Sequence, residues 1–251
     1  VLKKLTVTGT LQSGSVAEGE IIPLSQYQTA WTAVGEASLK KWRKATTAEA
    51  ILKGGYDQAV NDTDAKMLLD IQKGIRSDFF AFLATGTGKA QGANFQAALA
   101  QSWGQLQVLF EDDAVDTVYF LNPLDIAEYL GTAQVTVQTA FGLTYIKDFL
   151  GYSTLFLLPA RFIARGTVIA TPVENVDLYY IDPDDSEFNK LGLSYVTDGE
   201  TNLIGFKAEG DYSTAVGVTW ALMGMALWAE YLDAIAIADF SGETEGEGGG
   251  E

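Results

Sequence analysis

The sequence predicts a protein of the α+β class. Three observations support this prediction: a long amphipathic helix in the first third of the chain, a series of apolar strands after residue 155, and turns rich in glycine, proline or Asp-Gly between those strands. The chain has 251 residues, of which 47% are hydrophobic, so it is long enough and apolar enough to fill a substantial core.

The long helix is expected from Asp62 to Gly86. Its apolar side chains recur at spacings of three and four, which places them on one stripe of a helix: Leu68, Ile71, Ile75, Phe79, Phe82 and Leu83. Asp62 or Thr63 can cap the first turn, and Gly86 can supply the left-handed residue at the end. At 1.5 Å per residue, about 23 residues span roughly 34 Å. An ordinary core helix would show the same pattern, so the neighbouring segments must decide its role.

The first 47 residues are expected to form an arm and its return strand. Residues 3–11 alternate leucine or valine with threonine, and a second extended run occupies 37–47. The middle is rich in Ser, Thr, Gly and Gln and poor in large apolar residues, so it cannot belong to a core. An arm of roughly 15 residues reaches about 50 Å. Such an arm is either a disordered loop or a limb that becomes ordered on a neighbouring subunit, and both alternatives remain open at this point.

Two shorter helices are expected after the long one. Asn94 can cap the first, whose buried face should be Phe95, Leu99, Trp103, Leu106 and Phe110. The second follows Asn122-Pro123 and should end at Gly131. Buried strands are expected at 117–121, 155–158, 166–171, 176–181, 193–197, 202–208 and 234–240.

One stretch, from Tyr212 to Ala229, has no charged residue and reaches the lower length limit for a membrane-spanning helix. Its small and polar residues make it only weakly apolar, and Val216, Val218 and Trp220 alternate with small residues as in a buried strand. We therefore expect a strand and a protein that does not enter the membrane. The first residue is Val1 and no basic, then apolar leader follows it, so we expect processing or a missing upstream segment.

The chain contains no cysteine and no histidine. Structural zinc sites, disulfides, thiolate nucleophiles and every Ser-His-Asp or Cys-His arrangement are therefore excluded. The formal net charge is −17 at pH 7, so the chain as a whole should repel a phosphate backbone. We expect no catalytic residue, no cofactor, no metal site and no sequence-specific binding of nucleic acid.

A phosphate-binding loop is suggested by Gly88-Lys89 but is not supported by the surrounding residues. Leu83 stands where the motif needs its first glycine, and Ala90 stands where it needs Ser or Thr. A glycine-rich loop is the simpler interpretation.

Two groups of carboxylates could suggest a site. The acidic run 182–187 would need glycine at Glu187 to form an EF-hand loop, so a strand-end loop explains it better. Asp112 and Asp113 are adjacent and point apart, so a solvated helix end explains them better than an acid-base pair.

The only dense basic cluster in the sequence comprises Lys40, Lys41, Arg43 and Lys44. On a strand, alternate members face opposite sides, and such a cluster suits acidic neighbours on another strongly acidic chain. This is a hypothesis of subunit contact.

The order of these segments resembles the major capsid protein of tailed phages, the Hong Kong ninety-seven type of shell protein, over nearly the whole chain. The segments that carry the resemblance are Val16-Ala17-Glu18-Gly19 with Pro23 and Ser25, Lys41-Trp42 with Thr46 to Leu52, the helix 62–86, Phe120-Leu121-Asn122-Pro123-x-Asp125, and Ala226 to Phe240. No single motif decides the resemblance, whereas their order does.

The resemblance implies an extended loop, a spine helix, a peripheral domain and an axial domain. It implies these boundaries: 1–47 for the extended-loop arm and return strand, 48–115 for the peripheral domain with the spine helix 62–86 and the start of the axial domain, 116–205 for the axial domain, 206–240 for the closing strands of the peripheral domain, and 241–251 for a disordered acidic tail.

The same resemblance implies the function of a major head protein that assembles as hexamers and pentamers into an icosahedral shell around double-stranded DNA. Expected partners are copies of the chain, portal and scaffolding proteins, and a decoration protein, in a virion assembled in the host cytoplasm. An encapsulin-like cellular shell is the nearest alternative. A carboxylate-based hydrolase is the alternative of another class, and it would need two carboxylates facing each other in a pocket, about 5 to 10 Å apart.

As an intersubunit limb, the arm would contact other copies. The candidate interface residues are Glu18, Gly19, Trp31, Lys40, Lys41, Arg43 and Lys44. Some capsids of the family join subunits covalently through a lysine in the extended loop and an asparagine near the closing strands. Here Ile22 occupies the expected lysine position, no lysine lies between Thr6 and Glu36, and no asparagine follows Asn202. We therefore expect non-covalent assembly.

Overall fold

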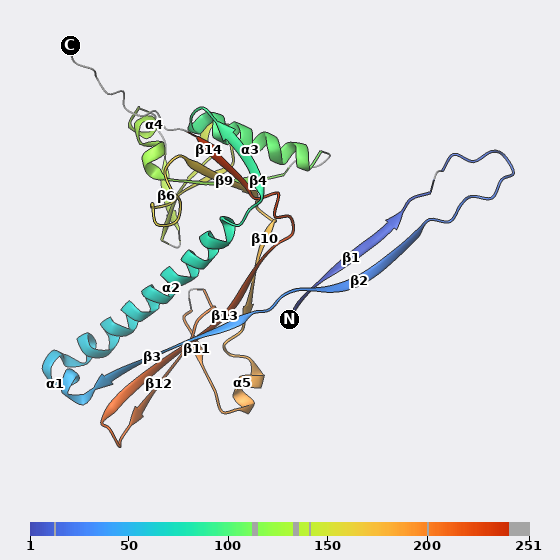
Figure 1. Cartoon of the computed structure of the whole chain (residues 1–251). Helices are drawn as coiled ribbons and strands as arrows, with labels where there is room; N and C mark the ends of the chain where they lie inside the picture. Colours follow the sequence, from blue (N-terminus) through green and yellow to red (C-terminus); the bar gives the residue numbers. More distant parts are fainter. Residues whose placement is uncertain (13, 112–114, 133–135, 141, 200, 241–251) are drawn as a thin grey trace, which may run out of the picture. The chain divides into compact units, whose positions relative to one another are not determined.

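The computed structural model describes residues 1–12, 14–111, 115–132, 136–140, 142–199 and 201–240. The chain folds into two compact units, each built from two stretches of sequence (Figure 1). Unit 1 contains Val1–Glu49 and Leu178–Trp228, and unit 2 contains Ala50–Asp177 and Ala229–Glu251. The expected acidic tail, 241–251, lies outside the described residues, as do Asp112 and Asp113.

Unit 1 is built from two β-sheets. The first pairs β1 (Leu2–Thr10) with β2 (Gln26–Gly35) in antiparallel fashion. The second has the order β10-β13-β12-β11, and β3 also pairs with β13; its strands are β10 (Val176–Ile181), β13 (Val216–Ala229), β12 (Gly205–Asp211), β11 (Val196–Thr197) and β3 (Ser38–Thr47). A short helix, α5 (Ser186–Lys190), lies between β10 and β11 in the sequence.

Strand β13 is the centre of the second sheet, because it pairs with both β3 and β12. It covers most of the uncharged stretch, and Ala221, Leu222, Met223 and Met225 are buried. The prediction of a buried strand is therefore confirmed. Among the described residues, no helix is long and apolar enough to cross a membrane.

The expected return strand of the arm belongs to this second sheet. Strand β3 pairs with β13 rather than with β1, whose partner is β2. The prediction that 37–47 closes the arm is therefore wrong. The physical reason is that β3 carries partly buried side chains on one face, Trp42, Lys44 and Thr46, and needs a packed sheet, whereas every residue of β2 is exposed.

The long helix α2 spans Asp62–Leu83. Ile71 and Leu83 of the predicted stripe are buried, and its other members are partly buried. The predicted caps are wrong. A π-helical turn, Asp57–Asn61, precedes α2, so the backbone at Asn61 is already helical and makes no side-chain cap bond. At the other end, Ala84 is the C-cap, two residues before Gly86.

The helix α1 (Ala48–Tyr56) comes before the π-helical turn. Its backbone leaves helical geometry at Gly55, where φ is 80°. Glycine adopts this positive φ without the steric cost that a β-carbon would add.

Unit 2 contains a seven-stranded mixed sheet (Figure 1). In sheet order its strands are β4 (Gly88–Gly92), β14 (Ala236–Phe240), β9 (Thr167–Pro172), β5 (Thr117–Leu121), β8 (Thr154–Leu157), β7 (Leu143–Lys147) and β6 (Val137–Ala140). The pairs β4-β14 and β5-β8 are parallel, and the other pairs are antiparallel. Helix α3 (Phe95–Leu109) packs on β4, β14 and β9, and α4 (Ala127–Thr132) follows a 3-10 turn, Pro123–Asp125. A second 3-10 turn is Phe149–Gly151.

The central strands of the seven-stranded sheet are buried on both faces. On β5, Tyr119 and Leu121 belong to a core cluster shared with α3, whereas Phe120 belongs to a second cluster shared with Phe80 and Leu83 of α2. Strand β9 alternates in the same way. Burial on both faces explains why these strands read as nearly continuous apolar runs.

The end of β5 is fixed by the Asn122-Pro123-x-Asp125 motif. Asn122 Oδ1 accepts from the amide of Leu124 (3.0 Å), and its Nδ2 donates to the carbonyl oxygen of Ile163 (3.2 Å). Asp125, whose side chain is 3% exposed, accepts from the amide of Gly166 (3.0 Å) and from Nε of Arg165 (3.3 Å). The motif therefore ties the end of β5 to the turn before β9.

Several predicted placements differ from the structure. The stretch 206–240 was expected as one set of closing strands, but β14 lies in the seven-stranded sheet while β12 and β13 lie in the five-stranded sheet. The reason is that β14 buries side chains on both faces of the larger sheet. The expected glycine-rich loop contains strand β4, and β6 and β7 were not expected. The expected axial segment, 116–205, runs from unit 2 into unit 1.

The first testable prediction concerns Asp125. Replacing it by alanine removes the charged acceptor of a backbone amide, so we expect the free energy of unfolding to fall by about 2 kcal/mol. Arg165→Ala is the matched control, because the Arg165 side chain is 65% exposed and its ion pair should contribute at most about 1 kcal/mol. Urea denaturation followed by circular dichroism measures both. Equal losses in the two variants would contradict the assigned role of Asp125.

Candidate assembly surfaces

The β1-β2 sheet has one apolar face and one polar face. Its register places Leu5 opposite Trp31, Val7 opposite Thr29, and Gly9 opposite Tyr27. Because side chains alternate along a strand, these pairs share one face, while Thr6, Thr8, Thr10, Gln26 and Gln28 share the other. We call Leu5, Val7, Tyr27 and Trp31 the apolar arm face.

The apolar arm face is uncovered in the single chain. Leu5 is 44% exposed, Val7 59%, Tyr27 58% and Trp31 69%. The Tyr27 ring lies over Gly9, where any β-carbon would collide with it. A two-stranded hairpin is at best marginally stable in water. The apolar arm face is therefore a surface that needs a partner.

The arm tip, residues 12–25 apart from 13, connects the two strands. The amide of Gln12 donates to Oγ of Ser25 (3.0 Å) at its base. Glu18 and Gly19 form a turn in which the amide of Glu20 donates to the carbonyl of Ala17 (3.1 Å), and Gly19 has φ 85°. Three large apolar side chains of the tip, Ile21, Ile22 and Leu24, are at least 72% exposed.

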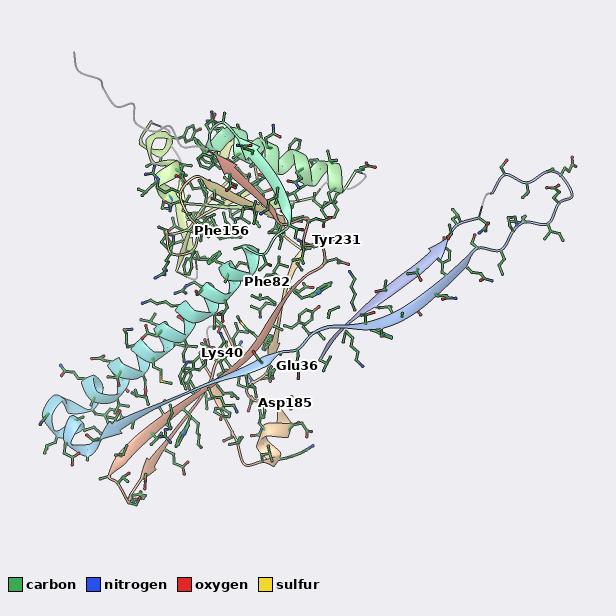
Figure 2. The ribbon with its side chains drawn as sticks, in the orientation of Figure 1. Glu36, Lys40, Phe82, Phe156, Asp185 and Tyr231 are labelled. Carbon is green, nitrogen blue, oxygen red and sulfur yellow. The ribbon has the colours of Figure 1, made fainter. Side chains whose placement is uncertain are left out.

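The predicted basic cluster lies on β3 and divides between the two faces of the sheet. Lys41 and Arg43 share one face and are exposed, whereas Lys40 and Lys44 lie on the other. Figure 2 labels Glu36, before β3 begins, and Lys40 within it.

Strand register brings Trp220 and Lys207 next to this cluster, and the sequence analysis did not include either residue among the interface candidates. Arg43 lies opposite Trp220 on β13, and Trp220 lies opposite Lys207 on β12. We call Lys41, Arg43 and Lys207 the basic row. Nothing local in the sequence joins Lys207 to residues 41–43, because their proximity depends on long-range strand pairing.

The other motifs of the sequence have structural roles. Gly88-Lys89 begins strand β4. In the acidic run 182–187, Asp182 accepts from the amide of Asp184 (2.9 Å) and Asp185 caps α5 by accepting from the amide of Glu187 (2.9 Å). The described residues contain no group of three or more Asp or Glu side chains that could hold a metal ion.

The pKa values of Asp70, Asp211 and Tyr119 are displaced. A hydrogen bond from Lys66 lowers the pKa of Asp70, and hydrogen bonds from Ser213 and Thr214 lower the pKa of Asp211. Burial raises the pKa of Tyr119. These groups lie on a helix surface, in the β12-β13 turn and in the core, and they form no acid-base pair.

Solved structures resemble this chain, although the sequence itself matches no protein-family model and none of the curated proteins with which it was compared. The capsid of cyanophage P-SCSP1u aligns with a TM-score of 0.57 at 9% identity, over 96% of this chain and 84% of that chain. The mature capsid of bacteriophage PhiM1 aligns with a TM-score of 0.56 at 6% identity, over 96% and 83%.

An encapsulin aligns almost as well. The holo-SrpI encapsulin complex from Synechococcus elongatus PCC 7942 gives a TM-score of 0.53 at 11% identity, over 96% of this chain and 83% of that chain. The chain has the Hong Kong ninety-seven type of fold. This confirms the expected fold class.

The Hong Kong ninety-seven fold accounts for both units, because the alignments cover nearly the whole chain. At identities of 6 to 11%, the role of an individual side chain in those proteins cannot be transferred to this chain. The apolar arm face, the arm tip and the basic row therefore rest on this sequence and its own geometry.

The second prediction concerns the independence of the arm. Deleting residues 1–35 should leave the five-stranded sheet folded, because β1 and β2 pair with each other. The cation-π contact of Lys4 with Trp228, at 5.0 Å, should contribute about 0.5 to 1 kcal/mol. We expect the melting temperature, followed by circular dichroism, to change by less than about 4 °C. Loss of cooperative melting would show that the arm is part of the core.

Proposed function

We propose that this chain is the major capsid protein of a tailed phage, which assembles as hexamers and pentamers into an icosahedral head shell around double-stranded DNA. The observation that carries the proposal is the uncovered apolar arm face on a chain with the fold of shell proteins. A second copy can cover that face at every position of a closed, symmetric assembly.

In this proposal, the two larger sheets correspond to the two domains of a capsid subunit. The five-stranded sheet belongs to the peripheral domain, and the seven-stranded sheet with α3 and α4 belongs to the axial domain. The β1-β2 sheet and the arm tip are the extended loop that lies on a neighbouring copy.

The predicted interface residues supply complementary charge between copies. Glu18 and Glu20 of the arm tip are acidic, and the exposed Lys41 and Arg43 of the basic row are positive. Exposed ion pairs contribute about 0 to 1 kcal/mol each, whereas full burial of a large apolar side chain contributes about 2 kcal/mol. The apolar arm face, with Trp31, therefore supplies most of the affinity, and Glu18, Gly19, Lys41 and Arg43 direct its position. Lys40 and Lys44 lie on the other face of β3.

The expected surroundings follow from this role. The shell is assembled in the host cytoplasm and remains in the virion, with portal and scaffolding proteins, and a decoration protein, as further partners. The net charge of −17 disfavours sequence-specific contacts with the enclosed DNA.

An encapsulin-like cellular shell is the second candidate, and the likeness to the encapsulin of Synechococcus elongatus favours it specifically. Both candidates require self-assembly, and they differ in content. DNA inside purified particles would favour the virion, whereas a copurifying enzyme would favour the cellular shell.

Imaging of the purified chain tests the proposal. Negative-stain microscopy and light scattering at about 0.1 M salt, where the Debye length is about 10 Å, should show closed particles. The folded chain without residues 1–35 is the matched control and should stay dispersed. A wild-type chain that remains monomeric over a wide range of salt and protein concentration would contradict the proposal.

The third prediction is that the shell is held by non-covalent contacts. The arm between Thr6 and Glu36 has no lysine, so an isopeptide bond from this segment lacks its amine. Boiled particles should run in a denaturing gel as one band near 27.0 kDa. A ladder of multimers would show that a lysine elsewhere forms covalent links.

A further inference from the structure

The three cations of the basic row have no partner within the described part of the chain. Lys41, Arg43 and Lys207 are exposed, and no ion pair or side-chain hydrogen bond joins any of them to another described residue. Because the chain carries a net charge of −17, these neighbouring cations form a place at which an acidic segment is attracted rather than repelled.

Strand pairing sets the spacing of the basic row. β3 and β12 lie on either side of β13 (Figure 1), so the Cα atoms of Arg43 and Lys207 are about 10 Å apart, one on each side of Trp220. Lys41 and Arg43 are two residues apart on β3, so they share one face at a separation of about 7 Å. The two cations on β3 are thus spaced to meet carboxylates at every second residue of an extended chain.

The carboxylates on the same face of the sheet leave the basic row positive. Strand alternation places Glu209 and Asp211 of β12 on this face. The carboxylate of Asp211 accepts from the hydroxyl groups of Ser213 (2.6 Å) and Thr214 (2.9 Å). Asp211 is therefore engaged within its own turn, and Glu209 alone cannot neutralise three cations.

An acidic segment of matching period follows β14 in the sequence. Residues 241–251, which lie outside the described residues, contain four glutamates and no basic residue. Three of the glutamates occupy alternate positions: Glu243, Glu245 and Glu247. Alternate side chains of an extended chain repeat every 7 Å or so, which is roughly the spacing of the two cations on β3.

The arm tip contains the same acidic tripeptide. Glu-Gly-Glu occurs twice in the chain, at 18–20 in the arm tip and at 245–247. The proposed function assigns the carboxylates of the arm tip to the basic row of another copy. A segment that presents the same pair of carboxylates competes for the same cations.

We propose that residues 243–247 occupy the basic row of their own chain in dispersed subunits and yield it to the arm tip of another copy during assembly. This inference rests on the proposed function and deepens it, because it adds a competitor that holds back assembly. Exposed ion pairs are individually weak, but attachment to the same chain gives the segment a high effective concentration. The arm tip displaces it because burial of the apolar arm face adds affinity that the acidic segment lacks.

Zero-length cross-linking of the full chain tests the contact directly. A carbodiimide activates a carboxylate and leaves as its urea when a lysine amine forms the amide, so it joins only groups in contact. In dispersed subunits, we expect Lys41 and Lys207 to be linked to residues 243–247 at least about fivefold more often than the exposed controls Lys53 and Lys190, because the row holds the segment. Mass spectrometry of the digested chain measures the yields.

Dilution of the dispersed subunits completes this measurement. A contact within one chain should give a yield that does not change with protein concentration. Equal yields at all four lysines, or a yield that falls on dilution, would overturn the inference.

A matched pair of charge variants tests the effect on assembly. The tail variant is Glu243→Gln, Glu245→Gln and Glu247→Gln. The control removes the same charge at exposed positions elsewhere: Glu111→Gln, Glu174→Gln and Glu187→Gln. By light scattering, the tail variant should assemble at a protein concentration at least about threefold lower than the control, since only the tail variant loses the competitor. A control that assembles as readily would show a general effect of net charge and overturn the inference.

The outcomes separate this inference from the proposed function. If no form of the chain assembles, the proposed function is contradicted, while the cross-links of dispersed subunits still decide whether residues 243–247 lie on the basic row. If the wild type assembles, links from Lys41 and Lys207 to residues 243–247 should be lost in particles and replaced by links to Glu18 or Glu20. Links to residues 243–247 that persist in particles at the same yield would overturn the proposed exchange.

Discussion

The apolar arm face is the constraint on which the rest of the account depends. Within the described part of the chain it belongs to a sheet of two strands, and such a sheet cannot cover its own apolar face. Each large side chain contributes about 2 kcal/mol when it is fully buried, so leaving Leu5, Val7, Tyr27 and Trp31 in water forgoes a sizeable part of the stability of a domain. The opposite face, with its threonines and glutamines, can remain in water.

The acidic residues of this chain lie outside the surface assigned to contact between copies. The net charge of −17 opposes the approach of one copy to another, and salt shortens the range of that repulsion. The apolar arm face, which is the surface assigned to contact between copies, carries no acidic residue. Within residues 1–35, the only acidic residues are Glu18 and Glu20 of the tip, where the exposed basic row of another copy can pair with them.

The sequence predicted those elements whose signal is local. Helix α2 follows from its apolar stripe, the start of α3 from Asn94, which accepts from the amide of Ala97 (2.9 Å), and β13 from its uncharged alternation. Prediction from the sequence failed where strands pair with partners far away in the chain, or where the surrounding structure changes the expected end of a helix. The partners of β1 and β3 depend on register, the basic row needs Lys207 beside Trp220, and the cap expected at Asp62 was displaced by a π-helical turn.

Amide hydrogen exchange of β1 and β2 tests the central claim most directly, because it compares the same residues in dispersed subunits and in assembled particles. If a second copy covers the apolar arm face, the amides of Leu5–Thr10 and Gln26–Val34 should exchange rapidly in dispersed subunits, where a two-stranded sheet opens readily. In particles the same amides should exchange at least about a hundredfold more slowly, as in a sheet held by a well-packed interface. Equal exchange in the two states would contradict the account.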